Sequence, residues 1–306
     1  MSAEAGDPLA RLRRWTRWRT PSPRARGVLL VVAIVVFLGG VTLSLQDLEV
    51  ALADLIWWPL VVVAVLGTPA TIAVNAAELR AMARLTTEGQ APSWGHAARV
   101  VVVATAANLL PLPGGALVRV HALRTAGASL GQATSVTLVA ALLWVAVAVG
   151  VAGAAALTWS PLVATLALLL AAAGIVATSV ALRWTTARWS FRGLAALALV
   201  ELITTLIHAA RLYLTLLALG VVASPTQALV LGAGAPLAAA AGVFPAGLGL
   251  AELLSALLAP VVALPAAAGF AVTALARVIG LAATVPVALA LGVRDLLPAQ
   301  PRQANP

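Results

Sequence analysis

Residues 108–119 combine the residue types that could bind an anion inside a membrane. They read NLLPLPGGALVR, and all but the final Arg119 belong to an uncharged run from 100 to 118. Two prolines and two adjacent glycines interrupt a regular helix here, so a new helix is expected to start near the glycines. The amides and dipole of a helix start, together with a following Arg, favour a phosphate. We therefore predict a lipid phosphate site formed by Asn108, Pro111, Pro113, Gly114, Gly115 and Arg119.

Two simpler interpretations of this segment stay open. The prolines could produce a plain kink in a continuous helix. Arg119 could also extend its guanidinium to the lipid headgroups without binding any ligand.

A second interrupted segment carries the opposite charge. Residues 244–252 read FPAGLGLAE, so that glycines again follow a proline but a carboxylate takes the place of the Arg. A carboxylate in this position would suit a cationic headgroup or a proton. We therefore add a second group to the predicted substrate site, formed by Pro245, Gly247, Gly249 and Glu252.

Other charged side chains fall inside the apolar segments, where they are energetically unfavourable and usually functional. They are Glu78, Glu201, His208, Arg211 and Arg277. The members at 201, 208 and 211 recur at helical spacing, and an internal polar cluster that joins helices is the alternative interpretation. For Arg211 we expect a backbone carbonyl or a carboxylate as partner, the candidates being Glu201, Glu252 and Glu78.

The sequence argues against several classes of catalytic site. It contains no cysteine, and its three histidines at positions 96, 121 and 208 are too far apart to form a metal set. Neither a nucleophile triad nor a phosphate-binding loop is present. We therefore expect no metal, no cofactor and no enzymatic activity. The enzyme alternative is an intramembrane transferase that uses Glu201 or Glu252 with His208 as acid and base.

The elements that position these residues are predicted to be membrane helices. Hydrophobic residues make up 62% of the chain and charged residues only 9%, which is typical of an all-α polytopic membrane protein. We expect six full spans and two re-entrant broken helices. The spans are residues 28–46, 55–79, two within 125–182 joined by a turn at 158–161, 194–219 and 266–293.

The distribution of Arg predicts the topology. All basic clusters face the cytoplasm if residues 100–118 re-enter, whereas a full crossing would place Arg119 and Arg124 outside. We therefore expect both termini in the cytoplasm of a bacterial or archaeal cell, with the protein in the inner membrane. Residues 1–27 form a basic segment that would face anionic lipid, and 294–306 form a tail. This position favours membrane lipid over nucleic acid as partner of the net positive charge.

Repeated spacings suggest that the membrane domain, residues 28–293, contains an inverted repeat. Arg80 and Ser93 are separated like Arg211 and Ser224, and Gly115 and residue 130 are separated like Gly249 and residue 264. The halves would cover about 57–157 and 194–293 and run in opposite senses. Interrupted helices at matching positions of inverted repeats are typical of transporter substrate sites.

At its two breaks the sequence resembles the lysylphosphatidylglycerol synthase transmembrane-region family, a flippase-like membrane domain. The resemblance rests on Asn108, Pro111, Gly115 and Arg119, then on Pro245, Gly247, Gly249 and Glu252, and on Arg277. The chain departs from the family pattern at Ala116, Ala246 and Ala251. The aminoacyltransferase domain that is joined to some members is not expected here.

The resemblance implies movement of a lipid rather than its synthesis. We expect a lipid flippase or a transporter of a lipid-linked substrate, with membrane phospholipids as partners. The alternative is a membrane scaffold for a separate glycosyltransferase or aminoacyltransferase, which would make a lipid-modifying enzyme the partner.

Overall fold

The computed structural model describes residues 23–50, 52–86, 91–108, 114–185, 190–241 and 248–291, and contains only helices and turns within these ranges. The predicted site residues Pro111, Pro113, Pro245 and Gly247 lie outside the described residues, as do 1–22 and the tail at 294–306. The expected all-α class is confirmed for this part of the chain.

Five helical segments of the described chain are long and apolar enough to cross a membrane. The first is continuous through α3 (Trp57–Val62), a π-helical turn η2 (Val63–Gly67) and α4 (Thr68–Thr86). The others are α7 (Leu130–Ala156), α8 (Pro161–Thr185), α9 (Phe191–Ala218) and α13 (Ala266–Ala290). A further helix, α2 (Pro23–Asp47), covers the first predicted span. A short 3₁₀ turn, η1 (Leu52–Asp54), follows it.

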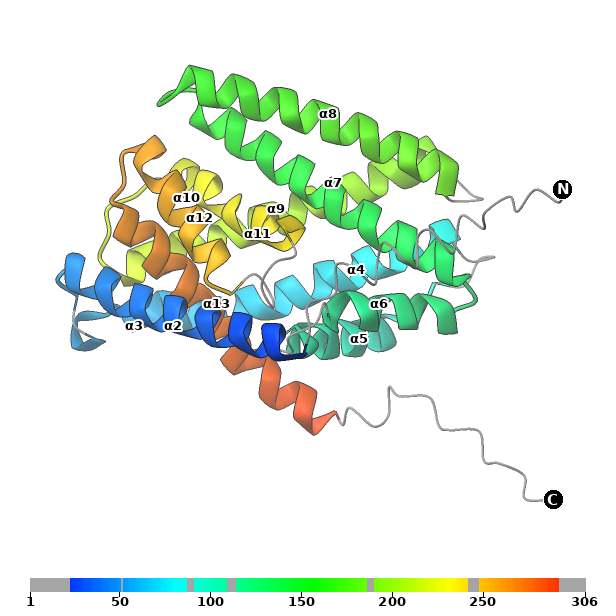
Figure 1. Ribbon diagram of the computed structural model, residues 1–306, viewed down its shortest axis with the longest axis horizontal. Coiled ribbons are helices and arrows are strands. Elements are labelled where there is room, and N and C mark those ends of the chain that lie inside the picture. The colour runs from blue at the N-terminus through cyan, green and yellow to red at the C-terminus, as the bar shows by residue number, and fades with distance from the viewer. Residues whose placement is uncertain are drawn as a thin grey trace, which may run out of the picture.

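The outer surface of α8 is apolar, as expected of a helix in lipid. Leu162 is 73% exposed and Leu170 is 68% exposed, although water would make such surfaces unfavourable. In Figure 1, α7 and α8 form a long pair along one side of the bundle. The chain is therefore a polytopic helical membrane protein.

Both interrupted segments fold into short helices. The first consists of α5 (Trp94–Ala107) and α6 (Gly114–Thr125), which pack against each other and are about 21 and 18 Å long. The second consists of α10 (Pro225–Gly232), α11 (Gly234–Ala241), α12 (Leu250–Leu258) and the 3₁₀ turn η4 (Ala259–Val262). None of them alone spans the hydrocarbon core of about 30 Å, which is the geometry that re-entrant hairpins need.

The same residue type starts the interrupted segment in each half. The Ser93 side chain accepts a hydrogen bond from the amide of His96 at the start of α5. Ser224 accepts one from the amide of Gln227 at the start of α10. These N-caps satisfy backbone donors that a helix start leaves unpaired. The equal spacings that ended at these serines thus mark equivalent helix starts.

The two halves of the chain make equivalent helix–helix contacts. In the first half α4 packs on α5, α5 on α6 and α6 on α7, while in the second α9 packs on α10, α11 on α12 and α12 on α13. The helix that precedes each half packs on the last helix of the other half, α2 on α13 and α8 on α7 (Figure 1). At the centre α4 packs on α9. This pattern supports the predicted repeat, whereas a symmetry axis in the membrane plane stays a prediction.

Gly269 allows the close approach of α12 and α13. A Cβ atom added there would lie 2.3 Å from the carbonyl oxygen of Ser255. Because this oxygen belongs to the backbone, no side-chain rotation can relieve the clash. We expect Gly269→Ala to destabilise the protein by about 1–3 kcal/mol, because overpacking forces the helices apart. The measurement is thermal unfolding in detergent. Gly95→Ala is the matched control, since its Cβ would meet nothing within 4 Å, and an equal effect of both variants would contradict this packing.

Candidate functional site

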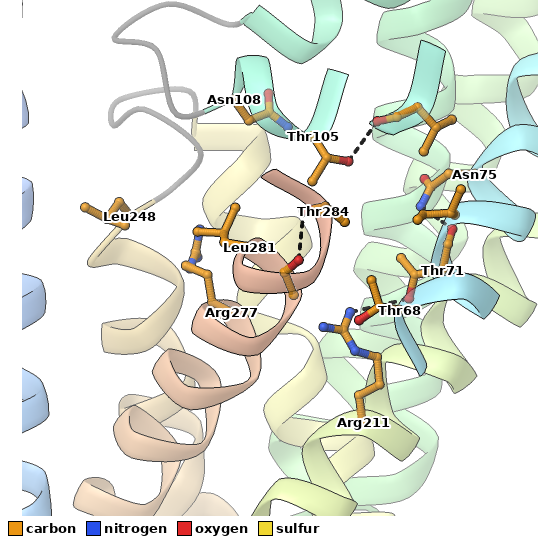
Figure 2. Close-up of a pocket in the computed structure, with 13 residues that line it drawn as sticks. Thr68, Thr71, Asn75, Thr105, Asn108, Arg211, Leu248, Arg277, Leu281 and Thr284 are labelled. Carbon is orange, nitrogen blue, oxygen red and sulfur yellow. Dashed lines mark hydrogen bonds between the residues drawn. The ribbon is translucent and has the colours of Figure 1, made fainter. Parts of the chain in front are cut away.

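A cavity of about 220 Å³ lies between α4, α5, α9 and α13. It touches the residues beside both breaks, since Asn108 at the end of α5 and Leu248 just before α12 line it together (Figure 2). Its polar lining consists mainly of two guanidinium groups, two amides and four hydroxyls. The polar residues are Arg211, Arg277, Asn75, Asn108, Thr68, Thr71, Thr105 and Thr284. The two breaks therefore meet at one central site rather than lying apart at the periphery.

Arg211 brings a positive charge into this cavity that no described carboxylate neutralises. From α9, its Nη2 donates to the carbonyl oxygen of Ala276 at 3.1 Å, and its Nη1 lies 3.4 Å from the hydroxyl of Thr71. Its Nε is buried without a hydrogen-bond partner, and no described carboxylate forms an ion pair with it. The expected backbone carbonyl partner is thus confirmed, and the three candidate carboxylates do not pair with it.

Two glycines make room for the Arg211 side chain. A Cβ at Gly280 would lie 2.9 Å from Nη2, and a Cβ at Gly67 would lie 2.9 Å from Cγ. Gly67 ends the π-helical turn η2, a type of irregularity that often occurs at functional sites. Any side chain at these positions would compete with the guanidinium for its place in the cavity.

Arg277 from α13 lines the same cavity but is paired. Its Nε donates to Oε1 of Glu252 on α12 at 2.6 Å, and the Glu252 side chain is fully buried. The cationic headgroup or proton expected at Glu252 stays a prediction, because Arg277 pairs with Oε1 while Oε2 is buried without a hydrogen-bond partner in the described structure. Since Arg277 is neutralised and Arg211 is not, the cavity carries a net positive charge.

Arg119 also has a partner, and it does not line the cavity. Its Nη1 is 2.9 Å from both carboxylate oxygens of Glu78, and its Nη2 donates to Oδ1 of Asn75 at 3.0 Å. The amide of Gly115 donates to Oδ1 of Asn108 at 2.9 Å. Protein groups therefore already pair with both the guanidinium and this amide, and the phosphate site at this helix start stays a prediction.

Glu201, His208 and Arg211 do not form the single polar cluster that their spacing suggested. Glu201 is 2% exposed and lies within electrostatic reach of Glu78 and Arg119. His208 lies near Arg211 and Arg277 instead. Glu201 and Arg211 are ten residues apart on α9, which corresponds to about 15 Å along the helix axis. Glu201 therefore lies beside the Arg119 ion pair and Arg211 lines the cavity, whereas the ring of His208 lies next to Gly232 of α10.

A row of polar groups on α4 connects the two regions. Nδ2 of Asn75 donates to the carbonyl oxygen of Thr71 at 2.8 Å, while Oδ1 of Asn75 accepts from Arg119. The hydroxyl of Thr71 contacts Arg211. Thr68, Thr71 and Thr284 were not among the predicted site residues. For the two threonines on α4, the signal in the sequence is polar side chains at helical spacing within an apolar span, at 68, 71, 75 and 78.

The arrangement suits anion binding better than acid–base chemistry. The cavity combines guanidinium and hydroxyl donors, and no carboxylate is among the described residues that line it. Nε2 of His208 is buried without a hydrogen-bond partner, so no described Glu forms an acid–base pair with that nitrogen. Within the described ranges no cluster of three acidic or His side chains could hold a metal ion.

No protein-family model, curated protein or solved structure matches this chain. The resemblance at the two breaks therefore stays a prediction, and the functional argument rests on the geometry of the cavity.

Proposed function

We propose that this protein moves a lipid, or a lipid-linked substrate, whose headgroup is anionic. The observation that carries the proposal is the unneutralised charge of Arg211 in a polar cavity between the two interrupted segments, within an apolar bundle. A buried charge without a partner is unfavourable, and an anionic ligand would remove that penalty. The site differs from the one expected from the sequence, because Arg211 takes the role assigned to Arg119.

The size of the cavity supports a headgroup rather than a whole lipid. A water molecule occupies about 30 Å³ of the liquid, so a volume of about 220 Å³ accommodates a small headgroup, such as a phosphate with a few further atoms, but no acyl chains. The acyl chains would stay outside, beside apolar surfaces such as that of α8. A lipid held by its headgroup alone can cross while its tails remain in the bilayer.

The repeated packing supports transport rather than simple binding. Each half contributes one interrupted segment to the cavity, and helices α4 and α9 of the two halves pack together at the centre. Rocking of one half against the other would open such a site to each side of the membrane in turn.

Lipid titration of the purified protein tests this proposal. We expect vesicles or nanodiscs containing phosphatidylglycerol to bind at least tenfold more tightly than those of phosphatidylcholine, because only the former brings a net negative headgroup to Arg211. Native mass spectrometry with both lipids measures the preference. Proteoliposomes with headgroup-labelled phosphatidylglycerol should also show protein-dependent exchange between leaflets. Equal binding of both lipids, or binding without exchange, would contradict the proposal.

A further inference from the structure

Glu201 is a buried carboxylate that makes no ion pair with any residue the structure describes. It lies on α9, its side chain is 2% exposed, and its Oε1 is buried without a hydrogen-bond partner. The charged groups that face it are Glu78 from α4 and Arg119 from α6. The described parts of α3, α7 and α10, which also pack on α9, contain no charged residue.

The remaining charges on the neighbouring helices are directed elsewhere. On α4, Arg80 contacts the carbonyl oxygen of Pro92 and the ring of Trp94, and Arg84 is exposed. On α13, Arg277 pairs with Glu252 at the cavity. Arg119 is therefore the cation that the buried carboxylates at 78 and 201 have in common.

One guanidinium cannot neutralise two buried carboxylates. In the structure Glu78 receives Nη1 of Arg119 on both of its oxygens, and Asn75 receives Nη2. An ionised Glu201 would then be an uncompensated charge in an apolar bundle, which is strongly unfavourable. A proton on Glu201 removes this charge and leaves the observed pairing intact.

We propose that Glu201, with Glu78 and Arg119, forms a proton-binding site of this protein. The structure corresponds to the protonated state, in which Glu201 is neutral and Arg119 pairs with Glu78. Loss of the proton to water leaves two carboxylates that compete for the same guanidinium and draws Arg119 towards Glu201. The Arg119 side chain is 23% exposed, so we place the exchange of the proton with water on this side of the group.

The site is connected to the cavity through α4. Arg119 donates to Asn75, Asn75 donates to the carbonyl oxygen of Thr71, and the hydroxyl of Thr71 contacts Arg211. A shift of Arg119 towards Glu201 would withdraw the donor from Asn75 and change one wall of the cavity. Proton release would thereby alter headgroup binding, a consequence that rests on the proposed function, whereas the proton site itself does not.

Infrared titration of the purified protein in detergent between pH 5 and pH 9 tests the proton site. We expect the carbonyl stretch of a protonated carboxyl group at neutral pH in the wild type, its loss in Glu201→Gln, and its retention in the control Glu49→Gln, an exposed loop residue. Glu78→Gln should free Arg119 for Glu201 and lower the midpoint of the band by at least one pH unit, a tenfold loss of proton affinity. If Glu201 had only a structural role, Glu201→Gln would not remove the band and Glu78→Gln would not shift its midpoint.

Several outcomes would overturn the proton site. They are absence of the band in the wild type at neutral pH, its persistence in Glu201→Gln, its loss in Glu252→Gln alone, or an unchanged midpoint in Glu78→Gln. A midpoint that depends on Na⁺ would replace the proton with a metal cation. Failure of anionic lipid binding with the band intact would instead refute only the proposed function, so the two failures are distinguishable.

Discussion

Arg211→Ala is expected to weaken the binding of phosphatidylglycerol about 10- to 100-fold without destabilising the protein. The binding loss follows from removing charge-assisted hydrogen bonds, each of which contributes about 1.5–3 kcal/mol. Stability should be unchanged or higher, because the variant also removes a buried charge that has no ionic partner among the described residues. Native mass spectrometry with the lipid and thermal unfolding without it measure the two effects separately.

Three further variants sharpen this result. Arg211→Lys should bind more weakly than wild type but better than Arg211→Ala, since an ammonium cannot reproduce a guanidinium fork. Gly280→Ala should also weaken binding, because its Cβ would lie 2.9 Å from Nη2 of Arg211. Arg124→Ala is the matched control, as this Arg is exposed at the end of α6. Wild-type affinity in Arg211→Ala would remove Arg211 from the site.

Arg119→Ala is expected to cause a large loss of stability, and its effect on the cavity passes only through Asn75, which lines the cavity and loses its donor. It leaves Glu78, whose side chain is 7% exposed, without its ion-pair partner, and deprives Asn75 of a donor. Breaking a buried pair from one side costs about 3–5 kcal/mol, and the partial exposure of Arg119 favours the lower end. Thermal unfolding in detergent measures the change.

A double-mutant cycle identifies the cause of this loss. Glu78→Gln in the Arg119→Ala background should recover much of the stability, because the amide removes the uncompensated charge. Arg84→Ala, an exposed Arg in the last turn of α4, should have almost no effect. If Arg119→Ala were instead stable and unable to bind anionic lipid, the phosphate site predicted from the sequence would be correct and the assignment to Arg211 wrong.

Local sequence features predicted most of the helical segments, although α4 runs to Thr86, beyond the expected end at 79. The turn expected at 158–161 lies between α7 and α8, and the spans expected at 194–219 and 266–293 correspond to α9 and α13. The sequence also located the first break, since α6 begins at Gly114, and the second, since Gly249 precedes α12 with a φ of 78° that glycine adopts easily. Runs of apolar residues, charges at their ends, prolines and glycines are local features, so a linear sequence contains them.

The equal spacings in the two halves were informative about the backbone but not about the side chains. The spacings that begin at Arg80 and Arg211 end at serines that cap helices, Ser93 and Ser224. The arginines at their starts have different surroundings, because Arg80 stacks on Trp94 while Arg211 enters the cavity. A repeated backbone therefore did not imply a repeated site.

Only the tertiary structure decided which charges are neutralised. Arg119, Arg211 and Arg277 looked alike as intramembrane cations in the sequence. Glu78 pairs with Arg119 across 41 positions and Glu252 pairs with Arg277 across 25, which leaves Arg211 without a described carboxylate. Such pairing depends on which helix faces meet, and α4, α6, α9, α12 and α13 come together only in the folded bundle. The uncompensated charge is thus a property of the packing rather than of any segment.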